Sequence, residues 1–269
     1  MSQTPAAVAV PESPTTADRL RRELDSFQTL WRGGYYEGNP LDPLAPSGYG
    51  AMGYMSVLHA TYVACIRPFI HPGVTALEIG PGRGAWTRAM LKAKAVWCLD
   101  ALPADHNGFW TYVGRHPHVH YHQVGDFSCA QLPDDSFDYL FSFGCLCHVS
   151  FDGIEAYMTN LWPKLRSGAN AFVMIADYEK YNWAAQHQRQ LDVRRALAPL
   201  AGIEWDGSPL PGQALVPKDV REDQEPSPGR WYHAGLERTC LMLLEKGYQI
   251  VTPDVGVNFR DPVIHFRKP

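Results

Sequence analysis

The residues with the clearest chemical potential form the glycine-rich run Gly80-Pro81-Gly82-Arg83-Gly84. Glycines there allow a tight turn and a close approach of the backbone to a ligand. Glu78 precedes the run, and the next apolar segment ends in Asp100, where a carboxylate commonly accepts hydrogen bonds from ribose hydroxyls. The G-x-G-x-G spacing differs from the G-x-G-x-x-G of dinucleotide binders. The pattern therefore predicts a nucleoside ligand and argues against a dinucleotide-dependent oxidoreductase.

Several blocks of the sequence together resemble one family, the class I S-adenosylmethionine (SAM)-dependent methyltransferases. The blocks, in family order, are LEIGPGRG, CLDAL, Gly125-Asp126-Phe127, LPDDSFDYLFSFGCLCHV and LRSGANAFVMIAD. The resemblance covers roughly residues 74–177 and the two final strands, and it implies an enzyme that uses SAM as its cofactor.

A narrower resemblance concerns the acceptor. The segments GYGAMGYMSVLHATYVACIRPFI and CLDALPADHNGFW are similar to bacterial sugar and polysaccharide O-methyltransferases, of the mycobacterial type that acts on methylmannose polysaccharide precursors. This resemblance implies sugar O-methylation and a role in polysaccharide biosynthesis.

The family resemblance also implies which residues hold SAM. The glycine backbone suits the amino-acid end, and Glu78 helps to orient that end. Asp100 accepts the ribose hydroxyls, Asp126 accepts from the adenine amine, and an aromatic ring packs on the adenine. The predicted cofactor-binding residues are Glu78, Gly80, Gly82, Gly84, Asp100, Ala101, Asp126, Phe127 and Phe143.

A histidine follows the fourth predicted strand, in Phe143-Gly144-Cys145-Leu146-Cys147-His148. A sugar hydroxyl has a pKa far above neutrality, so its proton must leave during methyl transfer, and a neutral imidazole can accept it. We predict His148 as the catalytic base. Structural support of the loop is the alternative role for this histidine.

A second polar group follows the fifth predicted strand. Asp177 and Glu179 are carboxylates that either bind substrate hydroxyls or, with His148, hold Mg²⁺, a cation that prefers oxygen ligands. Solvated charges at the start of a loop are the plainer interpretation of this group, and packing against the core is the plainer one for the downstream aromatic residues. The predicted substrate-binding residues are Tyr54, Asp177, Tyr178, Glu179, Trp231, Tyr232 and His233.

Apolar runs that alternate with helical segments must position these residues. Strand-like runs at 74–79, 95–99, 119–124, 137–143 and 170–176 are separated by helical candidates at 84–94, 102–115 and 151–165. Such alternation predicts βαβ units and a parallel sheet. Two further runs, GYQIVT and PVIHFRK, close the chain. We predict an α/β fold with a Rossmann-like class I methyltransferase sheet of seven strands, the last pair antiparallel.

The segments around this sheet predict the domain organisation. Residues 1–16 read as a flexible tail, and 17–72 read as an N-terminal helical lid with helices at 17–31 and about 52–67. Residues 73–269 form the SAM-binding domain. Its Pro- and Gly-rich part, 178–233, reads as an acceptor-side insertion with a helix at 183–198.

The composition of the chain limits which binding partners we expect. The 269 residues include 24 basic and 28 acidic side chains, so the formal net charge is −4. A mildly acidic chain is a poor non-specific binder of nucleic acid. No apolar run reaches the roughly 18–20 residues of a membrane span, and the N-terminus lacks a secretory pattern. We expect a cytoplasmic protein with a small-molecule or oligosaccharide acceptor and without nucleic-acid or membrane partners; a homodimer is compatible with the sequence.

The leading functional prediction is a SAM-dependent O-methyltransferase acting on a hydroxyl, with a saccharide as the expected acceptor. Small-molecule N- or C-methylation is the alternative among enzymes. A non-catalytic SAM-binding protein is the alternative outside them.

Overall fold

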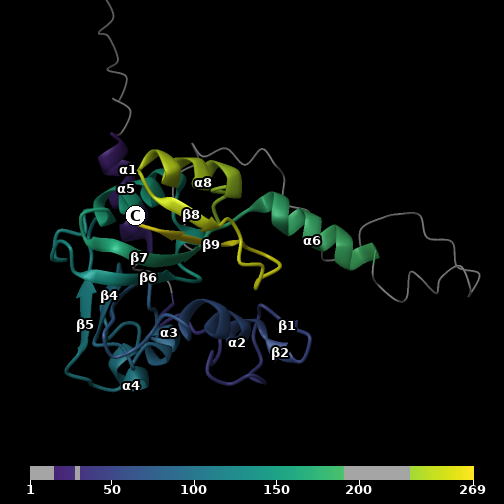
Figure 1. The fold of residues 1–269 in the computed structure, drawn as a ribbon, viewed down its shortest axis with the longest axis horizontal. Helices are drawn as coiled ribbons and strands as arrows, with labels where there is room; N and C mark the ends of the chain where they lie inside the picture. The colour runs from purple at the N-terminus through teal and green to yellow at the C-terminus, as the bar shows by residue number, and fades with distance from the viewer. Residues whose placement is uncertain (1–14, 28–30, 191–230) are drawn as a thin grey trace, which may run out of the picture.

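A mixed seven-stranded sheet forms the centre of the computed structural model, which describes residues 15–27, 31–190 and 231–269 (Figure 1). The strand order is β5-β4-β3-β6-β7-β9-β8. The first five strands are parallel, and β9 runs antiparallel to both of its neighbours, β7 and β8. The strands are β3 (Thr75–Ile79), β4 (Ala95–Asp100), β5 (Val119–Gln123), β6 (Phe137–Ser142), β7 (Leu165–Met174), β8 (Gln249–Thr252) and β9 (Val263–Arg267). The predicted sheet is confirmed.

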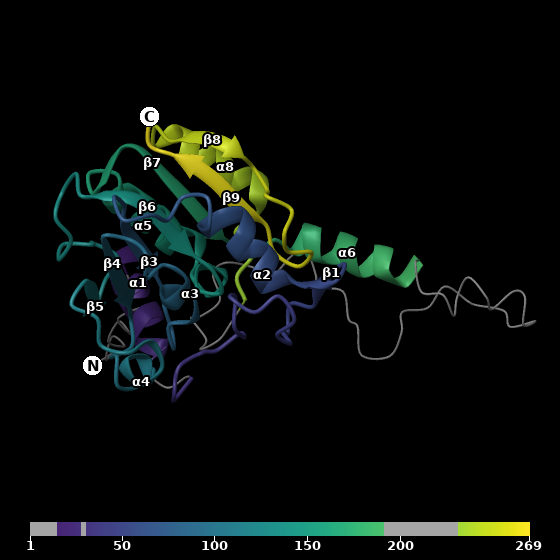
Figure 2. The ribbon, with the colours of Figure 1, turned by 60° about the horizontal axis from the view of Figure 1, so that its bottom comes forward.

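Helices cover both faces of the sheet, as right-handed crossovers between parallel strands require. Helices α1, α5 and α8 pack on one face and α2, α3 and α4 on the other (Figures 1 and 2). Their bounds are α1 (Thr16–Ser26), α2 (Val57–Thr61), α3 (Ala85–Ala89), α4 (Phe109–Val113), α5 (Phe151–Leu161) and α8 (Leu236–Glu245).

The two faces follow from the period of two along each strand. In β3, Leu77 and Ile79 point into the core beneath α1, α5 and α8, whereas Ala76 points into the core beneath α2, α3 and α4. Glu78 shares the face of Ala76, so this acidic side chain is directed at α3 and is 1% exposed. The alternation thus places a carboxyl group under the glycine-rich loop.

The first helix anchors the N-terminal segment to the sheet domain. Thr15 caps α1 and accepts a hydrogen bond from the backbone N–H of Asp18. The buried Glu23 carboxylate accepts hydrogen bonds from the backbone N–H and the hydroxyl of Ser150, the N-cap of α5. These bonds fix α1 at the end of the sheet where β6 passes into α5.

The predicted helix at 52–67 is partly wrong. Residues 51–56 form a small hairpin of β1 (Ala51–Met52) and β2 (Met55–Ser56), and α2 begins only at Val57, continued by a π-helical turn over Tyr62–Ile66. Gly53 turns the hairpin with a φ of 62°, a left-handed conformation that glycine adopts without strain. The spacing of apolar residues alone did not predict this turn.

Helix α6 (Tyr178–Gln190) begins directly after β7 and runs outward from the sheet (Figure 1). It starts five residues earlier than the helix predicted at 183–198. The rest of that helix and most of the predicted insertion lie outside the described residues, as does nearly all of the predicted tail. No helix in the described part of the chain is long and apolar enough to cross a membrane.

Candidate active site

A cavity opens at the carboxyl ends of β3, β4 and β6, with the N-terminal segment along its other side. Parallel α/β sheets bind ligands at this end because the loops that leave adjacent strands meet there. The strands contribute Gly80, Pro81 and Gly82 after β3, Asp100 to Leu102 from β4, and Phe143 to Cys145 and His148 after β6. The N-terminal segment contributes Leu24, Phe27, Trp31, Tyr35 and Glu37.

The glycine-rich loop has the conformation that its sequence predicts. Gly80 has a φ of 70°, and a Cβ at this position would overlap the Cys145 side chain across the cavity floor. A Cβ at Gly84 would overlap Val113 of α4, so this glycine packs against a helix rather than lining the cavity. Gly80 and Gly82 therefore line the cavity, whereas Gly84 allows close packing against α4.

Asp100 occupies the position expected of a ribose-binding carboxylate. It lines the cavity and accepts hydrogen bonds from the backbone N–H groups of Leu102 at 2.9 Å and Gly82 at 3.2 Å. Burial raises the pKa of Asp100 to about 6, against the lowering effect of those two N–H groups. Asn107 lies beside it and donates to the Tyr121 hydroxyl at 2.8 Å, and its buried side-chain oxygen has no donor among the described residues.

Glu78 lies beneath the loop and does not line the cavity. Its Oε2 accepts a hydrogen bond from the Thr87 hydroxyl of α3 at 2.5 Å, and its Oε1 has no hydrogen-bond partner in the part of the chain that the structure describes. Burial, together with the charge of the nearby Asp100, raises the pKa of Glu78 to about 8. In this position Glu78 supports the loop through α3.

His148 ends a short 3₁₀ turn, Leu146–His148, that follows β6. The backbone N–H of His148 donates to the carbonyl oxygen of Cys145 at 2.9 Å, which holds the turn tight. Its imidazole lines the cavity, and the ring of Trp31 lies 5.3 Å away between centroids. The structure thus brings together Gly80, Gly82, Asp100, Ala101, Phe143 and His148 around one cavity.

The remaining predicted cofactor residues lie outside it. Asp126 is exposed and accepts hydrogen bonds from the backbone N–H and the hydroxyl of Ser128. Phe127 is buried and packs edge-on against Tyr157 at 4.7 Å between ring centroids.

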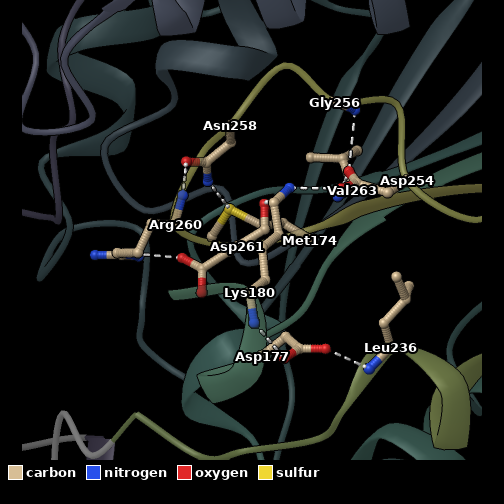
Figure 3. Close-up of polar contacts among 10 residues, drawn as sticks. All are labelled: Met174, Asp177, Lys180, Leu236, Asp254, Gly256, Asn258, Arg260, Asp261 and Val263. Carbon is tan, nitrogen blue, oxygen red and sulfur yellow. Dashed lines mark hydrogen bonds and ion pairs between the residues drawn. The ribbon is translucent and has the colours of Figure 1, made fainter. Parts of the chain in front are cut away.

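All the predicted substrate-binding residues except Tyr54 form a different cluster, outside the cavity lining. Asp177 caps α6 by accepting from the backbone N–H groups of Glu179 and Lys180, and its other oxygen accepts from the N–H of Leu236 at 2.8 Å (Figure 3). His233 Nδ1 accepts from the backbone N–H of Tyr178 at 3.0 Å. These contacts join the start of α6 to the start of α8.

The predicted set also includes Trp231 and Tyr232, which make structural contacts, and Tyr54, which lies apart from them. The hydroxyl of Tyr178 donates to the carbonyl oxygen of Trp231, and the Tyr232 backbone N–H donates to the carbonyl oxygen of Cys147. Tyr54 is fully exposed at the β1–β2 turn. Because both oxygens of Asp177 are occupied by backbone donors, the predicted Mg²⁺ site does not fit its arrangement. The described residues contain no group of three or more side chains suited to a metal ion.

Sequence reasoning missed a carboxyl group inside the cavity. Glu37 belongs to the Gly-, Pro- and Tyr-rich loop that follows α1, and its Oε2 accepts from the Trp86 indole N–H at 3.0 Å. Burial raises the pKa of Glu37 to about 8, although Trp86 and the nearby Arg260 act to lower it. The signal available in the sequence was an acidic residue in a long ordered loop, a setting in which function is common.

Comparisons with known proteins agree with the fold. Residues 76–168 match a family described as a methyltransferase domain. A solved S-adenosylmethionine-dependent methyltransferase from Mesorhizobium loti is 15% identical, with a TM-score of 0.51; the match covers 79% of this chain and 98% of that one. A protein from Listeria monocytogenes described in the same way gives the same identity, coverage and TM-score. No curated protein matches the sequence.

Proposed function

We propose that this chain is an enzyme of the SAM-dependent methyltransferase type and that it transfers the methyl group to a hydroxyl of a sugar or oligosaccharide. The matched methyltransferase domain and the fold shared with solved SAM-dependent methyltransferases support the first part of this proposal. One observation carries the assignment of the cofactor to the cavity: the cavity at the strand ends has Asp100 and Glu37 in its walls. Among the described residues that line it there is no lysine or arginine. Carboxyl groups without compensating cations favour a positively charged ligand. The pyrophosphate of a dinucleotide would lack a cationic partner there.

The chain's own residues fit the parts of SAM. In this proposal the Asp100 carboxylate accepts hydrogen bonds from two ribose hydroxyls, and the Asn107 oxygen, which has no donor among the described residues, offers a further acceptor beside it. Gly80 and Gly82 let the backbone approach the ligand closely. Ala101 and Leu102 give the neighbouring wall an apolar surface for the adenine. Asp126 does not line the cavity, and it remains a candidate acceptor of a hydrogen bond from the adenine amine.

The acceptor side is proposed around His148. SAM supplies an electrophilic methyl group on its sulfonium, so the chain has to align the acceptor, exclude water and remove a proton. We assign the removal of this proton to His148, whose ionisable side chain lies on the β6 side of the cavity. The rings of Trp31 and Tyr35 lie 5.7 Å apart and flank this region, and flat aromatic faces of this kind suit the apolar faces of a sugar ring.

Two measurements test the proposal. Calorimetric titration with SAM and with NAD should show binding of SAM alone, and a screen of acceptor sugars with methyl-labelled SAM should show transfer. Binding of NAD but not SAM would refute the cofactor assignment, and label transfer only to amines or carbon acids would refute the hydroxyl acceptor.

His148→Ala then tests the base. It should keep SAM affinity and lose about 10²–10⁴-fold in turnover on the true acceptor. His71→Ala, in the exposed turn before β3, is the matched control and should keep both. A His148→Ala enzyme with most of its turnover would assign this histidine to loop support.

A further inference from the structure

The loop that carries Glu37 is fastened to the glycine-rich loop. The backbone N–H of Arg83 donates to the carbonyl oxygen of Tyr35 at 3.2 Å, and the Arg83 guanidinium donates to that of Gly33 at 2.8 Å. The Cα of Gly82 faces Tyr35 so closely that a Cβ would lie 2.9 Å from the Tyr35 carbonyl oxygen. The Glu37 side chain therefore enters the cavity from a segment held at fixed distance from the β3 loop.

The direct bonds of the Glu37 carboxyl are to neutral donors. Oε2 accepts from the Trp86 indole at 3.0 Å, and Oε1 lies 3.4 Å from the Tyr49 hydroxyl, a weak hydrogen bond. Gly144 has a φ of 72°, and a Cβ there would overlap Glu37 Oε1. Glycine at the end of β6 thus leaves the space that this carboxyl occupies.

Arg260, a cationic side chain whose charge acts on Glu37, already has an anionic partner. Arg260, in the loop between β8 and β9, bonds the fully buried Asp261 at 2.5 Å (Figure 3). Asp261 also accepts a hydrogen bond from the Trp231 indole at 3.0 Å. The guanidinium stacks on Tyr49 at 4.7 Å and donates to its hydroxyl at 3.2 Å. Arg260 therefore orients Tyr49, while its charge is compensated by Asp261 rather than by Glu37.

The order of the strands places Glu37 and Asp100 on opposite sides of the glycine-rich loop. Asp100 ends β4 and Glu37 sits against Gly144 after β6, and β3 lies between β4 and β6. A nucleoside whose ribose is held by Asp100 and which crosses Gly80 brings its other end to Glu37. In SAM that end is the methionine half, which carries an α-ammonium group with N–H donors and a sulfonium with none.

We propose that the Glu37 carboxylate binds the α-ammonium group of the methionine half of SAM. This inference rests on the proposed SAM site. Glu78, the acidic residue that the sequence assigns to this end, lies beneath the loop and bonds Thr87 instead. The raised pKa of Glu37 agrees, because a carboxyl group that is costly to ionise alone is one that a bound cation stabilises.

Calorimetric titration of Glu37→Gln with three probes tests the proposal. SAM and S-adenosylhomocysteine both carry the ammonium, and methylthioadenosine lacks the amino-acid half. We expect SAM and S-adenosylhomocysteine to bind at least about 10-fold more weakly than to the wild type, since a hydrogen bond between charged groups is lost. Methylthioadenosine should bind within about twofold of the wild type, which shows that the cavity is intact.

Two controls accompany this titration. Asp100→Asn, at the ribose, should weaken all three probes. Glu245→Gln, at the exposed end of α8, removes the same charge far from the cavity and should change none.

Other outcomes overturn the proposal in distinct ways. Unchanged affinity for all three probes in Glu37→Gln removes Glu37 from the site, and an equal loss for all three makes its role a structural one. A loss for SAM but not for S-adenosylhomocysteine assigns the carboxylate to the sulfonium. A wild-type protein that binds none of the three refutes the proposed function itself, whereas failure in Glu37→Gln alone refutes only this inference.

Discussion

The stability of the ligand-free protein should depend on pH through Glu37. Replacing Glu37 by Gln removes the titrating group and keeps an oxygen that can accept the Trp86 hydrogen bond. The pKa of Glu37 is about 8 in the folded protein, above its ordinary value of 4.5. Between these two values the folded state keeps a proton that the unfolded state has lost. The free energy of unfolding of the wild type therefore falls as the pH rises through this window.

The size of the effect follows from the same two values. They differ by about 3.5, and at about 1.36 kcal/mol for each unit of pKa the upper limit is about 5 kcal/mol. Glu37 lines the cavity and is only partly buried, so solvent screening reduces this figure. We expect the stability of Glu37→Gln relative to the wild type to increase by about 1–3 kcal/mol between pH 5 and pH 8.

Urea unfolding at a series of pH values measures this difference. Glu78 and Asp100 also have raised pKa values, but they are present in both proteins and largely cancel in the comparison. Glu245→Gln, on the exposed end of α8, controls for the loss of one charge. A stability difference between Glu37→Gln and the wild type that stays constant from pH 5 to pH 8 would refute the reasoning, because Glu37 would then ionise alike in both states.

Further variants probe the rest of the cavity. Asp100→Ala should weaken SAM binding by about 1.5–3 kcal/mol, through the loss of charge-assisted hydrogen bonds to ribose, and calorimetry that shows unchanged affinity in the folded variant contradicts this. Gly144→Ala should destabilise the protein by about 1–3 kcal/mol and weaken SAM binding as well; Gly168→Ala has a similar φ of 83° with open space around it, so equal costs in urea unfolding would rule out the steric clash. Glu23→Ala should cost about 1–3 kcal/mol in urea unfolding and weaken SAM binding, because α1 carries cavity-lining residues; unchanged stability would show that this carboxylate does not anchor the helix.

The strand ends of the cavity could be predicted because their signals are local. Alternation in β3 and β4 fixes where each strand ends, and in a parallel sheet this also fixes where Gly80 and Asp100 meet. His148 follows β6 closely, so the short turn carries it to the same edge. These placements need only the period of the strands and the direction of the sheet.

The acceptor-side prediction had no such support. Asp177, Tyr178 and His233 have side chains that suit a polar substrate, yet the structure uses their polar atoms to cap α6 and to join it to α8. Capping and substrate binding demand the same residue types, so residue type alone could not separate them. Which of these polar atoms form hydrogen bonds within the protein depends on where the first residues of α6 and α8 meet.

Glu37 shows the converse problem. Its loop has no period, and its position depends on contacts with residues far along the chain: Arg83, Trp86 and Gly144. Each contact is a tertiary packing event in which a backbone carbonyl, an indole or a missing Cβ decides the outcome. A single sequence carries no signal for such pairings, although the loop's length and composition did indicate a functional segment.

The assignment of Glu37 to the ammonium group of SAM, rather than to the sulfonium, also has a kinetic consequence. Methyl transfer removes the positive charge of the sulfonium but leaves the ammonium unchanged. A carboxylate at the sulfonium would stabilise the ground state more than the transition state and would slow the reaction, whereas one at the ammonium stabilises both equally. Glu37 placed at the ammonium therefore contributes binding that raises affinity without raising the barrier. Glu37→Gln should accordingly increase KM for SAM and leave kcat nearly unchanged, and a rise in kcat would place the carboxylate at the sulfonium.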